Sequence, residues 1–229
     1  MAIADNLAAV RTRIAHTARA CGRDPQEIQL LAVSKTHSPQ SVREAAQAGQ
    51  RDFGENYLQE ARDKQIAVAN TALIWHFIGP IQSNKTRAIA ENFAWVHSVD
   101  RLKIAQRLST QRPATAPPLN VCIEINVSGE ASKSGVLPQA AAALAEQVAV
   151  LPQLKLRGLM AIPAPTSDLQ QQRQAFAQVR ALFDALNQRG FKLDTLSMGM
   201  SDDMEAAIAE GATIVRIGTA IFGARRAFK

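Results

Sequence analysis

The sequence lacks the cysteine pairs, long apolar runs and signal peptide that are typical of metal-binding, membrane and secreted proteins. Its two cysteines, Cys21 and Cys122, stand far apart with no CxxC pair, which argues against a disulfide framework or a zinc ribbon. No run of about 18 uncharged apolar residues occurs, so no membrane-spanning helix is expected. The N-terminus carries Asp5, Arg11 and Arg13 where a signal peptide would have an apolar core. We therefore expect a cytoplasmic protein.

Aromatic residues are also scarce, at 5% of the chain, and Tyr57 is the only tyrosine. The 26 basic and 20 acidic residues give a net charge of +6, spread along the sequence. A nucleic-acid-binding surface usually combines a basic stripe with interleaved aromatic residues. We therefore interpret the charged residues as lying on the solvent-exposed faces of helices. Nucleic-acid binding is kept as an alternative that a steep salt dependence would reveal. The apolar content of 47% is too high for a disordered chain.

Eight short apolar segments alternate with longer segments of helical period. Their nearly continuous apolar character, as in LLAVS and NVCIEINV, is typical of parallel strands that are buried on both faces. Eight strand–helix steps favour an α/β fold, with residues 1–229 forming one (β/α)8 TIM barrel. An open doubly wound sheet is the alternative, although no GxGxxG follows the first strand. The predicted strands are 29–34, 51–54, 74–78, 95–98, 119–126, 154–161, 195–198 and 213–217.

Residues that start and stop helices support this division. Ser38 followed by Pro39 predicts a helix start, and Gly49 its end. Residues 4–21 predict an extra helix before the first strand. Because only eleven residues follow Gly218, we expect this N-terminal helix to cover the flank that a full eighth helix would otherwise cover. Further predicted N-caps are Ser83, Asp100 and Ser201, and further C-terminal stops are Gly190 and Gly211.

Lys35 is the lysine best placed for chemistry. It directly follows LLAVS, at the carboxyl end of the first strand, where TIM-barrel active sites lie. An apolar floor lowers a lysine pKa by disfavouring the ammonium form, and a neutral amine can form a Schiff base with an aldehyde. The alternative is an ion pair between Lys35 and Glu55. Four other lysines are predicted to lie at strand starts or on solvated helix faces: Lys155, Lys192, Lys64 and Lys103.

The ends of the last two strands resemble a phosphate site. Loops after strands seven and eight often bind phosphate in this fold. Here Ser201 offers a hydroxyl, Gly199 allows close backbone approach, and Gly218 and Thr219 offer N–H groups and a second hydroxyl. Together with Lys35 they could hold a molecule that carries an aldehyde and a phosphate. The two acids after Ser201 are predicted to turn outward and complement a helix dipole: Asp202 and Asp203.

Six blocks resemble the pyridoxal-phosphate homeostasis protein family: LLAVSKT, FGENYLQEA, WHFIGPIQSNK, GLMAIPA, MGMSDDMEAAIAEGAT and VRIGTAIFGAR. The resemblance runs from residue 30 to residue 225. It implies the fold-type III barrel shared with the N-terminal domain of alanine racemase, and a role in vitamin B6 and amino-acid homeostasis. It also implies pyridoxal 5′-phosphate (PLP) as the cofactor. The residues that it assigns to this cofactor are Lys35 for the Schiff base, Asn56 near the ring, and Ser201, Gly218 and Thr219 for the phosphate.

Arg216 joins this set through the related racemase barrel, in which the arginine of a similar block faces the pyridine nitrogen. It lies two residues before Gly218 and so shares its face of the strand. An arginine stays charged and cannot accept a proton from the ring, so it weakens the electron sink of the cofactor. The alternative role for Arg216 is a salt bridge within the barrel.

Groups that a racemase needs are missing from the sequence. The resemblance to alanine racemase implies a tyrosine from a partner's β-domain as second acid/base, but we expect no such β-domain beside the predicted barrel, and Tyr57 is the only tyrosine of the sequence. We therefore expect a monomeric PLP-binding regulator or carrier without robust turnover, which serves PLP-dependent apoenzymes. A weak amino-acid racemase or another Schiff-base enzyme is the alternative.

Several weaker candidates complete the sequence analysis. No HxH or HExxH spacing occurs, so no metal site is expected, and His76 and His97 are interpreted as core or ring-stacking residues. His37 stands where the family often has a second lysine, and residues 225–228 depart from the family's C-terminal block, which puts any second cofactor site in doubt. Two lysines could aid anion binding or cofactor transfer from their positions alone: Lys85 and Lys133.

Overall fold

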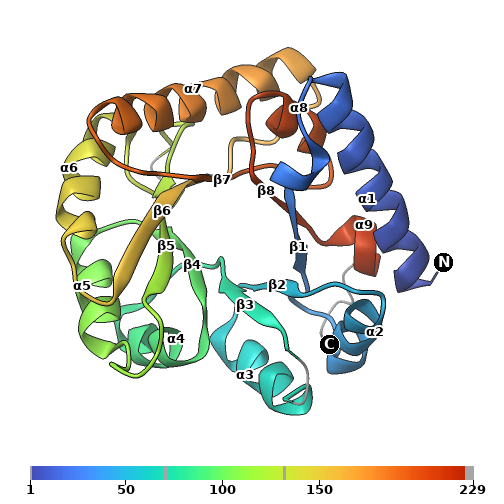
Figure 1. Cartoon of the computed structure of the whole chain (residues 1–229), viewed down its shortest axis with the longest axis horizontal. Helices are drawn as coiled ribbons and strands as arrows, with labels where there is room; N and C mark the ends of the chain where they lie inside the picture. Colours follow the sequence, from blue (N-terminus) through green and yellow to red (C-terminus); the bar gives the residue numbers. More distant parts are fainter. Residues whose placement is uncertain (1, 70–71, 131–132, 225–229) are drawn as a thin grey trace.

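The computed structural model describes residues 2–69, 72–130 and 133–224, and its eight strands close into one parallel barrel (Figure 1). Each strand pairs with the next in sequence, and β8 pairs with β1. The barrel prediction is thus confirmed, and the open-sheet alternative is wrong. The strands start and end within one residue of their predicted limits: β1 Gln29–Val33, β2 Asp52–Glu55, β3 Ile74–Phe77, β4 Trp95–Val99, β5 Leu119–Ile125, β6 Leu154–Ala161, β7 Thr195–Ser197 and β8 Ile214–Ile217.

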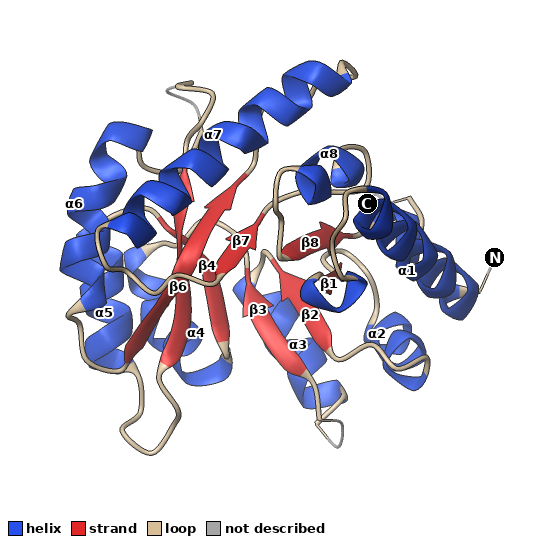
Figure 2. Cartoon of the chain, turned by 45° about the horizontal axis from the view of Figure 1, so that its top comes forward, coloured by secondary structure: helices blue, strands red, loops and turns tan. Residues whose placement is uncertain are grey.

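Helices surround the barrel on its outside (Figure 2). Apolar residues of these helices and of the outward-facing strand positions form the main core, because each helix turns its apolar face to the sheet. The α-helices are α1 Ile3–Ala20, α2 Pro39–Gln47, α3 Leu58–Ala67, α4 Thr86–Asn92, α5 Leu102–Gln111, α6 Pro138–Ala149, α7 Leu169–Gln188, α8 Met204–Ala209 and α9 Thr219–Phe222. Two 3₁₀ turns, η1 Pro25–Glu27 and η2 Ser83–Lys85, precede β1 and α4.

Helix α1 takes the place that the sequence analysis predicted for it. Helix α9 has only four residues, and α1 lies against α9, α8 and α2 (Figure 1). The Asn6 amide donates to the Ile221 carbonyl at 2.8 Å and so ties the two ends of the barrel chain together. No helix among the described residues is long and apolar enough to cross a membrane.

The predicted helix boundaries are partly confirmed. The Ser38 hydroxyl accepts from the Ser41 N–H, and Gly49 adopts a φ of +84° just past the end of α2, as a C-terminal glycine does. Gly190 and Gly211 likewise follow α7 and α8 with positive φ. The predicted N-caps Ser83, Asp100 and Ser201 are wrong, because a short turn or an extended residue intervenes before each helix. The observed N-caps are Lys85, Arg101 and Asp203.

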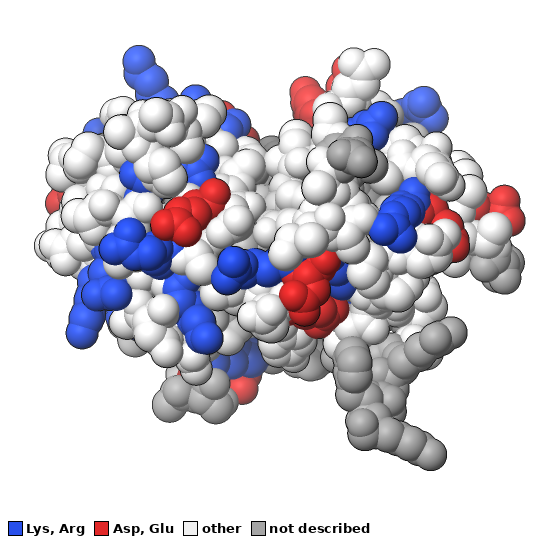
Figure 3. All heavy atoms as spheres, turned by 90° about the horizontal axis from the view of Figure 1, so that it is seen from below, with Lys and Arg blue, Asp and Glu red and all other residues white. Residues whose placement is uncertain are grey.

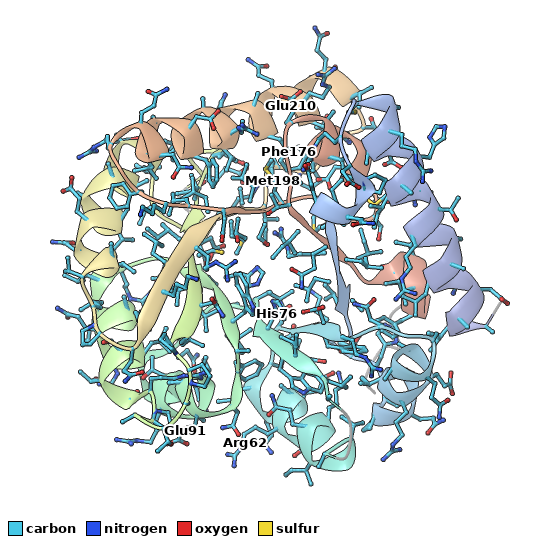
Figure 4. All side chains as sticks on the ribbon, viewed as in Figure 1. Arg62, His76, Glu91, Phe176, Met198 and Glu210 are labelled. Carbon is cyan, nitrogen blue, oxygen red and sulfur yellow. The ribbon has the colours of Figure 1, made fainter. Side chains whose placement is uncertain are left out.

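The inside of the barrel combines apolar and polar layers. A small apolar cluster, separate from the main core, consists of Leu31, Val33, Ile78, Trp95, Cys122, Met160 and Ile214. Buried polar side chains lie beside it, among them His76 of β3 (Figure 4). On the outside, basic side chains lie among acidic ones over the face drawn in Figure 3. Buried polar side chains require hydrogen-bond partners. These hydrogen bonds fix the positions of the side chains that form the site.

Candidate functional site

A cavity of about 220 Å³ opens where the strands end at their carboxyl side. The sequence analysis named six site residues, from the ends of β1, β2, β7 and β8, and the structure brings all of them to this cavity: Lys35, Asn56, Ser201, Arg216, Gly218 and Thr219. The remaining lining is mostly apolar, with Val33, Ile78, Ile162 and Met200, together with His37 and Asp202. An apolar cavity with a few convergent polar groups is the usual form of a small-molecule site.

Lys35 lies in a tight turn directly after β1. The next residue, Thr36, has a φ of +65°, a conformation that costs a β-branched residue about 1–3 kcal/mol. Its backbone N–H donates to a Glu60 carboxylate oxygen at 2.6 Å. On the other side of Lys35, the Ser34 hydroxyl donates to Glu55 at 2.6 Å. Two carboxylates therefore hold the turn that presents Lys35.

Lys64 joins these two carboxylates and corrects the sequence analysis, which placed it on the surface. The residue is 1% exposed, and its ammonium group donates to Glu55 at 2.7 Å, to Glu60 at 2.6 Å and to the Ser34 carbonyl at 2.6 Å. All three ammonium hydrogens are used, which is what burial of a charge demands. The ion pair of Glu55 is thus with Lys64. Burial raises the pKa of Glu55, and the adjacent Lys64 opposes that rise.

The geometry of this cluster explains why sequence reasoning missed Lys64. Only Ala61 and Lys64 are buried on α3, so the helix has no apolar stripe that would reveal its inner face. The Glu60–Lys64 spacing of four residues is a signal, but such pairs are common on solvated helices.

Arg216 points from β8 into the barrel and is 4% exposed. One guanidinium nitrogen donates to the Ser197 hydroxyl at 2.9 Å and the other to the Ala161 carbonyl at 2.9 Å. Within the described parts of the chain it forms no ion pair, so the salt-bridge alternative is wrong. Burial lowers the pKa of Arg216 to about 10, and the guanidinium therefore keeps its positive charge near neutral pH.

The segments that follow β7 and β8 bring hydroxyl groups and Gly218 to the cavity, with the close-packed Gly199 nearby in sequence. Gly199 has a φ of +94°, and a Cβ there would lie 2.5 Å from the Ala207 Cβ, so only glycine fits. At Gly218 a Cβ would lie 3.2 Å from the Val33 carbonyl oxygen, so this backbone also packs tightly against β1. Ser201 and Thr219 add their hydroxyls to the lining.

The prediction that the two neighbouring acids turn outward is wrong for Asp203. Asp202 is exposed but lies at the cavity. Asp203 is half-buried and accepts from the Met200 N–H at 2.6 Å, because the loop before α8 needs an acceptor for this amide. Burial raises the pKa of Asp203.

The weaker candidates separate into one that reaches the cavity and several that do not. His37 lines the cavity, and its ring stacks on Phe222 with centroids 5.1 Å apart. Lys85 is exposed, and Lys133 pairs with Glu130 at 3.1 Å; neither lines the cavity. Among the described residues no group of three metal-binding side chains occurs. The block at 225–228 lies outside the described residues.

Comparisons with known proteins agree on one family. Residues 5–226 match the model of the alanine racemase N-terminal domain. Proteins named pyridoxal phosphate homeostasis protein are 67% identical in Pseudomonas aeruginosa and 58% identical in Escherichia coli K12, each over 97% of this chain and 96–97% of the relative.

Solved structures show the same relationship. PipY of Synechococcus elongatus with PLP bound is 38% identical and has a TM-score of 0.84, over 96% of this chain and 100% of that one. An alanine racemase of Clostridium difficile, 14% identical with a TM-score of 0.72, matches over 93% of this chain and 56% of that one and shares the fold. The chain therefore belongs to the pyridoxal phosphate homeostasis protein family, which is built on the alanine racemase N-terminal domain.

Proposed function

We propose that this protein binds PLP as a Schiff base on Lys35 and acts in intracellular PLP (vitamin B6) and amino-acid homeostasis. The observation that carries the proposal is the convergence of Lys35, Asn56, Ser201, Arg216, Gly218 and Thr219 on one cavity. The relatives named for PLP homeostasis and the PLP-bound structure of PipY support it.

The donor set of the cavity fits the groups of PLP. The cofactor supplies an aldehyde that combines with an amine, and Lys35 is the amine on the lining. Ser201, Thr219 and the backbone of Gly218 would hold the phosphate. The buried Asn56 Oδ1 has no hydrogen-bond partner among the described residues, and it would accept a hydrogen bond from the ring substituents. Unsatisfied buried polar atoms are rare in folded proteins, so this one favours a bound ligand.

Holding the cofactor, without turnover of a substrate, is the second part of the proposal. Arg216 cannot accept a proton, so beside the pyridine nitrogen it would keep the ring a weak electron sink. Tyr57 is 58% exposed and is not among the lining residues, so it is not placed as a second acid/base. A racemase assay with D- and L-alanine is expected to show no turnover above that of free PLP. Sustained turnover would favour the alternative of a weak Schiff-base enzyme.

The setting of this function is part of the same proposal. Both cysteines, Cys21 and Cys122, are free thiols, which agrees with a reducing cytoplasmic compartment. One closed barrel and one family match over residues 5–226 support residues 1–229 as a single PLP-binding domain. The proposal includes a monomer that delivers PLP to PLP-dependent apoenzymes, and a cavity that opens at the strand ends is compatible with release of the cofactor.

A PLP titration followed by absorbance tests this function. The wild type is expected to develop a Schiff-base band that saturates at one PLP per chain. Lys35→Ala removes the one lysine that lines the cavity among the described residues and should abolish the band. Lys103→Ala, at an exposed position of α5, is the matched control and should titrate like the wild type. An undiminished band in Lys35→Ala would contradict the assignment.

A further inference from the structure

A continuous chain of hydrogen bonds crosses the inside of the barrel from the cavity to its opposite end. Arg216 donates to the Ser197 hydroxyl at 2.9 Å, and this hydroxyl lies 2.7 Å from His97 Nδ1. His97 Nε2 lies 2.9 Å from His76 Nδ1, and His76 Nε2 lies 3.1 Å from Asp52 Oδ1. The five side chains come from β8, β7, β4, β3 and β2. Figure 4 labels His76 beside β3.

The two ends of this chain open to different faces of the protein. Arg216 lines the cavity at the carboxyl ends of the strands. Asp52 is the first residue of β2, and it lines a separate hollow between α1 and the starts of β1 and β2. Its side chain is 16% exposed, whereas both histidine rings are fully buried. The chain therefore has a positive charge at one mouth of the barrel and a negative charge at the other.

The chemistry of the groups assigns one direction to every hydrogen. A carboxylate only accepts, so His76 carries its proton on Nε2 and offers Nδ1 as an acceptor. His97 must then donate from Nε2 and accept at Nδ1, which leaves the Ser197 hydroxyl to donate to His97. The lone pairs of Ser197 remain for the Arg216 guanidinium. Burial lowers the pKa of both histidines, in agreement with two neutral rings.

Reversal of this order would leave a mismatch beside the cavity. With the protons on both Nδ1 atoms, His97 would donate to Ser197, which already accepts from Arg216. Ser197 would then accept both hydrogen bonds with its two lone pairs, and its own hydroxyl hydrogen would have no acceptor among the contacts of the described residues. A buried donor without an acceptor costs about 1–3 kcal/mol. The Asp52 carboxylate selects against this state because it requires the proton of His76 on the other nitrogen.

We propose that Asp52 is a positioning residue for the cavity: through His76, His97 and Ser197 it fixes the hydrogen-bond direction that orients the Arg216 guanidinium. The relay itself is a property of the ligand-free chain. Only its consequence for the cofactor rests on the proposed function, since Arg216 would face the PLP ring.

Nitrogen-15 NMR of the histidine rings in the ligand-free protein tests the relay. The chain has four histidines, so spectra of His76→Gln and His97→Gln assign the two buried rings. The wild type is expected to show both rings neutral near pH 7, with the proton on Nε2. A proton on His97 Nδ1 would overturn the proposal. This measurement on the wild type does not depend on any variant of Asp52.

Variants of Asp52 test transmission along the relay. Asp52→Ala removes the terminal acceptor, so the nitrogen signals of His97, which does not touch Asp52, should shift together with those of His76. Asp52→Asn keeps an amide oxygen as acceptor and should restore the wild-type pattern. Glu91→Ala removes an exposed acid of α4 (Figure 4) and is the matched control. An unchanged His97 in folded Asp52→Ala would contradict the relay.

A PLP titration separates the relay from the proposed function. Asp52→Ala is expected to bind PLP about fivefold more weakly, within the range of coupling through a packed network, with Asp52→Asn and Glu91→Ala close to the wild type. Unchanged PLP affinity in Asp52→Ala would overturn the effect on Arg216. Failure of the wild type to bind PLP would refute the proposed function, and the ring tautomers would still decide whether the relay exists.

Discussion

Two buried cations are stabilised in opposite ways: Arg216, which lines the cavity, and Lys64, which lies behind the turn that presents Lys35. Lys64 is surrounded by the carboxylates of Glu55 and Glu60 and by one carbonyl, so its charge is balanced where it lies. Among the described residues, the hydrogen-bond acceptors of Arg216 are a hydroxyl and carbonyl groups. Burial lowers its pKa to about 10, which is the sign of a charge with incomplete compensation.

This difference in charge compensation indicates a separate role for each cation. A buried ion pair holds its surroundings together because either partner alone would be an uncompensated charge. Lys64 therefore fixes the turn around Lys35. A cation whose partners are neutral keeps its field for a ligand, and Arg216 presents this field to the cavity. Changes at Lys64 should mainly affect folding, and changes at Arg216 should mainly affect binding.

Replacement of Lys64 should produce the largest change in stability. Lys64→Met leaves Glu55 buried without its cation, and the free energy of unfolding should fall by about 3–5 kcal/mol. Urea denaturation measures this loss. Adding Glu55→Gln should recover part of it, and Lys103→Met on exposed α5 should change stability by less than about 0.5 kcal/mol. A loss below about 1 kcal/mol in Lys64→Met would contradict the comparison.

The second prediction concerns Glu124, a buried carboxyl of β5 whose charge interacts with Arg216. Burial raises its pKa to about 7, and the nearby Asp100 adds to the rise. Because the folded protein binds this proton more tightly than the unfolded chain does, its contribution is complete below pH 4.5 and is lost as the pH rises through 7. The loss should be about 2–3 kcal/mol.

Thermal or urea denaturation between pH 4.5 and 8 measures this contribution. Glu124→Gln cannot titrate and should flatten the decline. Glu130→Gln, at an exposed position, should leave the wild-type slope in place. Equal slopes in the wild type and Glu124→Gln would show that Arg216 is better compensated than its pKa indicates.

Replacement of Arg216 should produce the smallest change in stability. Arg216→Met loses its hydrogen bonds but also removes a poorly compensated charge, so the free energy of unfolding should fall by about 1 kcal/mol. PLP affinity should fall at least about tenfold, as expected for loss of a charged hydrogen bond. The contrast between the two cations would be contradicted if Arg216→Met lost as much free energy of unfolding as Lys64→Met, or if it bound PLP with wild-type affinity.

The fold and the cavity residues could be predicted from sequence because the same strand–helix pattern repeats along the chain. Parallel strands buried on both faces appear as apolar runs, and their carboxyl ends meet at one side of a barrel. Residues that directly follow such runs, such as Lys35 and Ser201, must therefore converge. Their convergence needs no knowledge of side-chain contacts.

The buried polar contacts could not be predicted, because they depend on register and on side-chain direction. His76 pairs in register with Trp95 on the adjacent strand β4, and its hydrogen bond to His97 depends on this register and on the direction of both side chains. Lys64 shows no pattern that separates it from a solvated lysine such as Lys103. The loop before α8 likewise uses Asp203 to satisfy a backbone amide, a need that only the folded loop creates.

Borohydride reduction of the PLP-loaded protein, followed by peptide mass mapping, tests the central claim most directly. The reaction fixes PLP to the lysine that holds it. The account predicts modification of Lys35 and none of Lys64, whose three hydrogen bonds keep it a buried ammonium. Modification of Lys64 or another lysine in place of Lys35, or no modification at all, would contradict it.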